Sequence, residues 1–175
     1  DEAAEFFYRY ARELDSRLGY DHPRTIEAYV AQADAYRRTG EAKAAEQVVK
    51  MIRIPFDGSM GSNSRVYTVS MQREIARSRV GLLLLSLGEP NTALAYLQTA
   101  QTNLESDLGA EHPWTIRVMA ERGLAMAAHG EAVAGEHLVR AALALADVNR
   151  NIAPAEKSVW ERRLTQLTSN PEVRP

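Results

Sequence analysis

The sequence contains no cysteine, no marked excess of either charge and no long hydrophobic run. The lack of cysteine excludes disulfide bonds, thiol nucleophiles and zinc sites built from thiolates. The 21 Lys and Arg residues against 23 Asp and Glu leave a formal net charge of -2, whereas nucleic-acid-binding domains are usually clearly basic. No uninterrupted apolar stretch is longer than residues 80–85, which is far shorter than the roughly 20 residues that span a bilayer. We therefore expect no nucleic-acid partner and no direct membrane insertion.

Strand signals are also scarce, because polar and apolar residues alternate nowhere over a convincing run. Alanine and leucine, which favour helices, are abundant. No basic start followed by an apolar core marks a signal peptide. The chain begins at Asp1 rather than Met, which indicates a processed protein or an excised domain. The composition leaves the compartment open between the cytoplasm and, for a domain of a membrane-anchored parent, the periplasm.

Two segments, 18–26 and 108–116, share the pattern Leu-Gly-x-x-His-Pro-x-Thr-Ile. A second mark is the pair Gly-Glu, which recurs at Gly40, Gly88 and Gly130. Gly88 and Gly130 are 42 residues apart, whereas Gly40 and Gly88 are 48 apart, so the middle unit carries six extra residues. Self-similarity at such a period is the signature of a repeat array.

Each half of a repeat is predicted to be one helix. Pro23 and Pro113 suit a first helical turn, where a missing N–H costs nothing. The glycine of each Gly-Glu pair suits a helix end, because glycine tolerates the left-handed closing conformation. Pro55 is expected to end its helix early. The predicted helices are 2–18, 23–39, 41–53, 64–87, 90–108, 113–129, 131–148 and 154–168.

Small and large residues recur at fixed offsets when the Gly-Glu pairs are aligned. The small residues are Ala33, Gly81 and Gly123 in the first helices and Ala45, Ala93 and Gly135 in the second. The large residues after them are Tyr36, Leu84 and Met126, then Val49, Leu97 and Val139. With its Leu-Gly-x-x-His-Pro-x-Thr linker, this pattern resembles tetratricopeptide repeats of the longer variety found in kinesin light chains and many bacterial signalling proteins.

The resemblance implies an all-α fold, an α-solenoid of about eight helices in antiparallel pairs. Small residues against large ones at these offsets let two helices approach closely and interlock. The expected parts are a half-unit over 1–19, units over 20–61, 62–109 and 110–148, and a capping helix with a tail over 149–175.

The resemblance also implies a non-catalytic module that binds a peptide or a partner helix in a concave groove along the first helices. The aligned groove positions are Glu27, Val30, Asp34, Arg37, Ser78, Arg79, Leu82, Leu85, Arg117, Ala120, Glu121 and Leu124. Chaperone-binding repeats clamp a terminal carboxylate with Lys and Asn, and Val30 and Asp34 stand at two of those places. Two alternatives stay open. The chain can be the regulatory or sensor part of a larger bacterial signalling protein such as a Ser/Thr kinase, or an architectural self-association module.

No constellation of residues predicts catalysis, a metal site or a cofactor. His22 and His112 lie at equivalent turns, which favours a structural hydrogen-bonding role over a ligand role. His129 and His137 lack a metal-binding spacing. The glycine- and serine-rich segment 57–64 lacks the Gly-Lys-Ser/Thr ending of a phosphate-binding loop, so a linker is favoured over a binding loop.

The first predicted helix, residues 2–18, carries an apolar face. The residues of this face are Phe6, Phe7, Tyr10 and Leu14. In the repeat scheme this helix is the second of a pair whose first helix would precede Asp1. Terminal repeats need polar outer faces for solubility, so we expect this face to pack on an upstream segment or, failing that, on a second copy.

Overall fold

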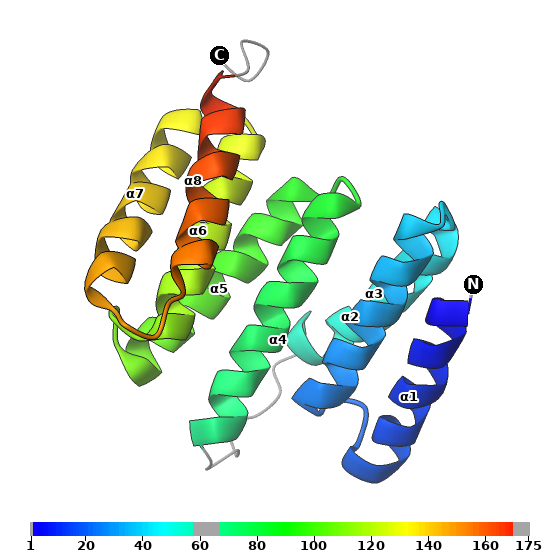
Figure 1. Ribbon diagram of the computed structural model, residues 1–175. Coiled ribbons are helices and arrows are strands. Elements are labelled where there is room, and N and C mark those ends of the chain that lie inside the picture. The colour runs from blue at the N-terminus through cyan, green and yellow to red at the C-terminus, as the bar shows by residue number, and fades with distance from the viewer. Residues whose placement is uncertain (1, 58–66, 170–175) are drawn as a thin grey trace. The chain divides into compact units, whose positions relative to one another are not determined.

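The computed structural model describes residues 2–57 and 67–169, and side chains over 2–53 and 71–169 (Figure 1). The predicted all-α fold is confirmed, and no strand occurs within the described ranges. The helices are α1 (Glu2–Leu18), α2 (Pro23–Arg38), α3 (Ala42–Asp57), α4 (Tyr67–Ser86), α5 (Pro90–Leu108), α6 (Pro113–Ala128), α7 (Ala132–Val148) and α8 (Pro154–Ser169). Within these ranges no helix is both long and apolar enough to cross a membrane.

One predicted helix end is wrong. α3 was expected to stop at residue 53 because of Pro55, yet it continues to Asp57. A proline removes only one backbone hydrogen bond, and near the end of a helix the turns before it offset that loss. Most of segment 57–64, interpreted as a linker, lies outside the described residues.

The two His-Pro turns start their helices in the same way. His22 precedes α2, and its Nδ1 accepts a hydrogen bond from the backbone N–H of Arg24 at 3.2 Å. His112 precedes α6 and accepts from Trp114 N–H at 3.3 Å. Each imidazole therefore satisfies one of the N–H groups that a helix start leaves unpaired. The structural role expected for the two histidines is confirmed.

The end of α2 shows why glycine stands in the repeated Gly-Glu pair. Gly40 has a φ of +84°, and the backbone N–H of Glu41 donates to the carbonyl of Tyr36 at 2.8 Å. This six-residue closure needs a left-handed residue, which glycine adopts without a steric penalty. The turn directs α3 back along α2 as an antiparallel neighbour.

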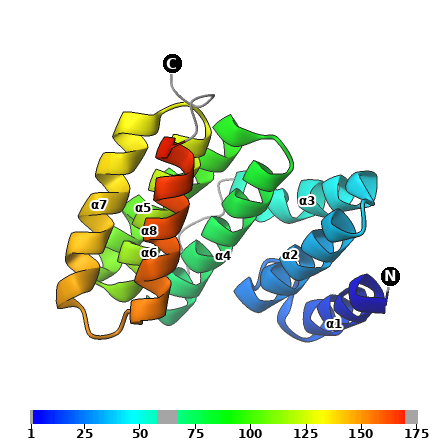
Figure 2. The same ribbon diagram turned by 45° about the horizontal axis from the view of Figure 1, so that its top comes forward.

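The chain forms two compact units, Asp1–Glu89 and Pro90–Pro175. In the first unit, α2 packs against α1, α3 and α4. In the second, α6 packs against α5, α7 and α8, and Figures 1 and 2 show α6, α7 and α8 side by side. The core shared by these last three helices is Ile116, Ala120, Leu124, Val139, Ala142, Ala146, Ile152, Trp160 and Leu164.

The helices α6 and α7 approach each other through glycine. A Cβ atom on Gly123 would lie 2.8 Å from the carbonyl oxygen of Gly135 and 2.8 Å from a methyl group of Val139. Real Cβ atoms do not come so close, so the two backbones can touch only because both positions lack a side chain. The sequence pattern of small residues facing large ones is therefore found where α6 and α7 cross.

Candidate partner-binding surface

The first unit holds eight of the predicted groove positions, on the neighbouring helices α2 and α4. Seven of these eight positions keep part of their surface accessible. They are Glu27, Val30, Asp34, Arg37, Arg79, Leu82 and Leu85. On α2 the four positions recur every three or four residues and so form one stripe. The stripe of α4 contains two leucines and one arginine. Both helices therefore offer accessible polar and apolar groups.

Asp34 does not act as an isolated negative charge on α2. Its two carboxylate oxygens accept from Arg37 and Arg38, each at 2.8 Å. Because the three side chains carry one negative and two positive charges, this end of α2 is basic rather than acidic. Surface ion pairs of this kind contribute little to stability, typically below about 1 kcal/mol. Their effect is to orient the guanidinium groups.

Ser78 is buried, in contrast to the other predicted positions on α4. Its side chain is 2% exposed, and its hydroxyl donates to the carbonyl of Ile75 at 2.8 Å. Beside it, Arg77 donates to the carboxylate of Glu74 at 2.8 Å, and both side chains are largely buried. The opposite charges of Glu74 and Arg77, three residues apart, are the sequence signal that could have predicted this pair.

The predicted groove positions of the second unit face the chain itself. Ala120 and Leu124 belong to the core that α6 shares with α8, together with Trp160 and Leu164. Arg117 and Glu121 are half-buried and do not belong to that core. α8 thus covers Ala120 and Leu124, two positions of α6 that the repeat alignment assigned to a partner.

Arg117 is the clearest case of a predicted groove residue that contacts α8 instead. Its Nε donates to Glu156 Oε1 on α8 at 2.6 Å, and a second nitrogen donates to the Asn151 carbonyl at 3.2 Å. Its guanidinium carbon also lies 4.9 Å from the centre of the Trp114 ring. Arg117 therefore ties α6 to α8 and to the turn before it. Trp160 and Leu164, four residues apart on α8, are the sequence signal that could have predicted the docking of α8 on α6.

The predicted apolar face of α1 is partly exposed. Phe6 is 60% exposed and Tyr10 46%, and their rings stack at 6.3 Å between centroids. Phe7 and Leu14 are half-buried. A hollow of about 260 Å³ lies between the first turns of α1 and the last turns of α2. Its lining residues are Ala3, Phe7, Ala31, Asp34, Ala35 and Arg38.

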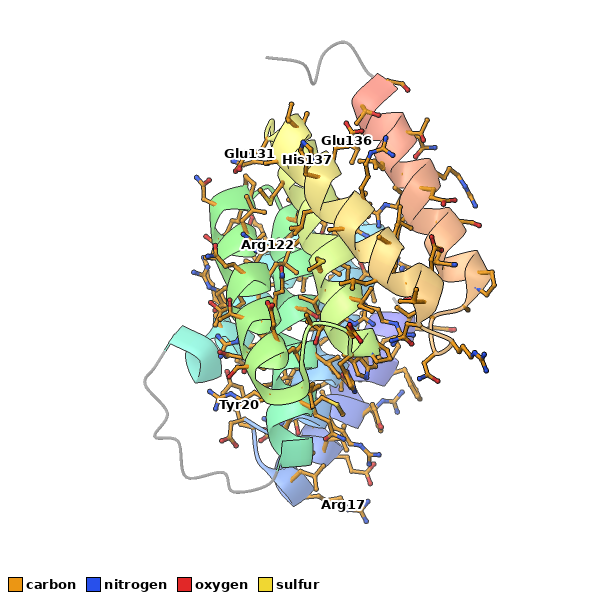
Figure 3. The ribbon with its side chains drawn as sticks, turned by 90° about the vertical axis from the view of Figure 1, so that its left-hand side faces the viewer. Arg17, Tyr20, Arg122, Glu131, Glu136 and His137 are labelled. Atoms are coloured by element: carbon orange, nitrogen blue, oxygen red, sulfur yellow. The ribbon has the colours of Figure 1, made fainter. Side chains whose placement is uncertain are left out.

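In the part of the chain that the structure describes, no three His, Asp or Glu side chains meet as a metal site. Glu131, Glu136 and His137 lie at the start of α7 (Figure 3), where Glu136 pairs with Arg140 at 2.7 Å. His129 instead hydrogen-bonds Asn91 at 3.2 Å.

Two tyrosines of the first unit are held in their neutral form. Burial raises the pKa of Tyr20, labelled in Figure 3, to about 12, with smaller contributions from Tyr29 and Asp15. Burial also raises the pKa of Tyr29, and the two rings lie 6.4 Å apart. Both phenols therefore stay protonated to a higher pH than an exposed tyrosine does.

Known structures identify the fold. A crystal structure of nearly identical TPR-like repeats from a protein assigned as a kinesin light chain of Podosopora anserina is similar, with a TM-score of 0.65 and 18% identity. The match covers 98% of this chain and 80% of that one. A single-substitution variant of the same repeats has a TM-score of 0.66, with 79% of its chain covered. This chain has a TPR-like repeat fold. No protein-family model and no curated protein matches the sequence.

Proposed function

We propose that this TPR-like chain is a non-catalytic module that binds a peptide or a helix of another protein along α2 and α4. The observation that carries the proposal is the difference between the two units. In the second unit α8 covers the inner positions of α6, whereas in the first unit Val30, Leu82 and Leu85 keep part of their surface accessible. Stacked helix pairs commonly present such surfaces to partners.

The chemistry of this surface indicates the kind of partner. Leu82 and Leu85 supply apolar area, and Arg79 is exposed one residue beyond the buried Ser78. Together with the basic end of α2, this surface suits a segment that combines an apolar anchor with acidic residues. Apolar anchors give such complexes most of their affinity, and charges at the rim give association rate and specificity.

The proposal is tested by selecting binding peptides from a displayed library and measuring their affinity for purified variants. Leu82→Glu should weaken binding by on the order of tenfold, because Leu82 is the proposed apolar anchor. Arg79→Glu should also weaken binding. Val148→Glu is the matched control, because Val148 is 77% exposed on α7 of the other unit. Circular dichroism should show unchanged helix content in all three. Selected peptides that bind both α4 variants at full affinity would contradict the proposal.

A further inference from the structure

The last two turns of α2 carry a charged set that α4 and α6 lack. Counted back from the glycine of the Gly-Glu pair, α2 has Asp34, Arg37 and Arg38. The same three places hold apolar or small residues elsewhere, namely Leu82, Leu85 and Ser86 in α4 and Leu124, Ala127 and Ala128 in α6. The repeat fold therefore does not require these charges, and exposed ion pairs of this kind add little to stability.

The ion pairs of Asp34 leave the guanidinium of Arg37 imperfectly matched. Nε and Nη2 of Arg37 both donate to one oxygen, Asp34 Oδ1, at 3.1 and 2.8 Å. The other oxygen, Oδ2, lies 2.8 Å from Arg38 Nε. The strongest arginine–carboxylate pairs are bidentate, with two parallel hydrogen bonds to two oxygens. Arg37 lacks this geometry because Asp34 serves two arginines.

The set is accessible from the surface proposed above. The side chains of Asp34 and Arg37 are 31% and 37% exposed. Arg37 lies on the same stripe of α2 as Val30, seven residues earlier. Asp34 and Arg38 also line the hollow beside α1, whereas Arg37 is not among its lining residues. Arg37 is therefore the cation of this set that a partner along α2 and α4 reaches, whether or not another segment fills that hollow.

We propose that Asp34 is a specificity-determining residue, which masks Arg37 until a side-chain carboxylate of the partner displaces it. The incoming carboxylate offers one oxygen to Nε and the other to Nη2, and so forms the bidentate pair that Asp34 does not form. Asp34 keeps its pair with Arg38. A partner without an acidic residue at this place finds Arg37 already neutralised and gains nothing from it. The identity of the partner rests on the function proposed above, but the masking of Arg37 does not.

The masking is tested first without any peptide. The probe is glutarate, a small dicarboxylate, titrated at constant ionic strength while the Nε–H signals of the arginines are followed by nuclear magnetic resonance. In Asp34→Asn the affinity at Arg37 should rise by on the order of fivefold, which is about what an exposed ion pair contributes. The signal of Arg140, which pairs with Glu136 on α7, is the internal reference and should respond equally in all variants.

Glu27→Gln is the matched control for this titration. Glu27 is exposed on the same stripe two turns before Asp34, so the substitution removes the same charge without releasing Arg37. It should raise the affinity at Arg37 far less than Asp34→Asn does. Circular dichroism should show unchanged helix content in both variants. An equal affinity at Arg37 in Asp34→Asn and Glu27→Gln would overturn the proposal.

Peptides selected on the α2 and α4 surface give the second measurement. With their C-termini amidated, acidic peptides should bind Asp34→Asn on the order of fivefold more tightly than the original chain. Replacing their Asp and Glu residues by Asn and Gln should abolish this gain, and so should Arg37→Gln in the chain. Acidic peptides that bind both chains equally would overturn the role of Asp34 in specificity. If no peptide can be selected, the proposed function fails, while the glutarate titration still decides whether Asp34 masks Arg37.

Discussion

A Cβ atom on Gly135 of α7 would lie 2.5 Å from the carbonyl oxygen of Gly123 on α6, so these two glycines set the distance between the helices. The same atom would lie 2.5 Å from the backbone nitrogen of Ala127. Neither neighbour can rotate away, because both atoms belong to the backbone. The core behind this crossing includes Val139 and Leu124.

Gly135→Ala should therefore destabilise the chain. Alanine improves helix propensity by about 1 kcal/mol, whereas overpacking a close crossing costs about 1–3 kcal/mol. We expect a net loss of about 1 kcal/mol in the free energy of unfolding, measured by urea denaturation. Ala141→Leu, at an exposed position of the same helix, is the control and should change stability by less than about 0.5 kcal/mol. A more stable Gly135→Ala variant would show that the helices can separate without loss.

The repeated sequence features predicted most of this fold because each depends on local backbone geometry. These features are the His-Pro pairs, the Gly-Glu pairs and the small residues at helix crossings. They located the eight helices to within a few residues at most ends. The groove positions depend on which helix covers which. The repeat alignment assigns Arg117 to the groove, whereas in the structure Arg117 pairs with Glu156 of α8. Sequence periodicity does not encode that a capping helix takes the place of a partner.

His22→Ala should weaken the start of α2. Its imidazole accepts from Arg24 N–H, and removing a capping acceptor costs about 1 kcal/mol. His22→Asp should retain most of the stability, because a carboxylate is a good cap and also suits the positive end of the helix dipole. Urea denaturation of both variants checks this. Equal losses for alanine and aspartate would mean that the ring matters for packing and not as an acceptor.

Arg117→Ala should lower the free energy that holds α8 against α6 by about 1–2 kcal/mol. The pair with Glu156 is about one-quarter exposed and doubly hydrogen-bonded. Hydrogen exchange should then rise in α8 more than in α1. Arg140→Ala removes an exposed pair with Glu136 and serves as the control, with an expected effect below about 0.5 kcal/mol. Unchanged protection of α8 in Arg117→Ala would refute the assigned role.

Alkaline pH should destabilise the first unit through Tyr20. Its pKa is about 12 in the folded chain and 10.0 as the ordinary value, so folding favours the neutral phenol. The stabilisation is complete below about pH 10 and is lost as the pH rises from 10 toward 12. Tyr20→Phe should reduce this loss, as measured by urea denaturation at pH 8 and pH 11. Tyr10→Phe, at an exposed ring, is the control. A loss of equal size in Tyr20→Phe would assign the effect to other groups.

The docking of α8 has a spectroscopic consequence. The chain has two tryptophans, Trp114 beside Arg117 and Trp160 in the core between α6 and α8, and both belong to the second unit. Tryptophan emission therefore follows that unit alone, whereas far-ultraviolet circular dichroism follows the helices of both. Denaturation curves recorded with the two signals coincide only when the units unfold as one cooperative system. A separation of the midpoints would give the stability of each unit from a single, unmodified sample.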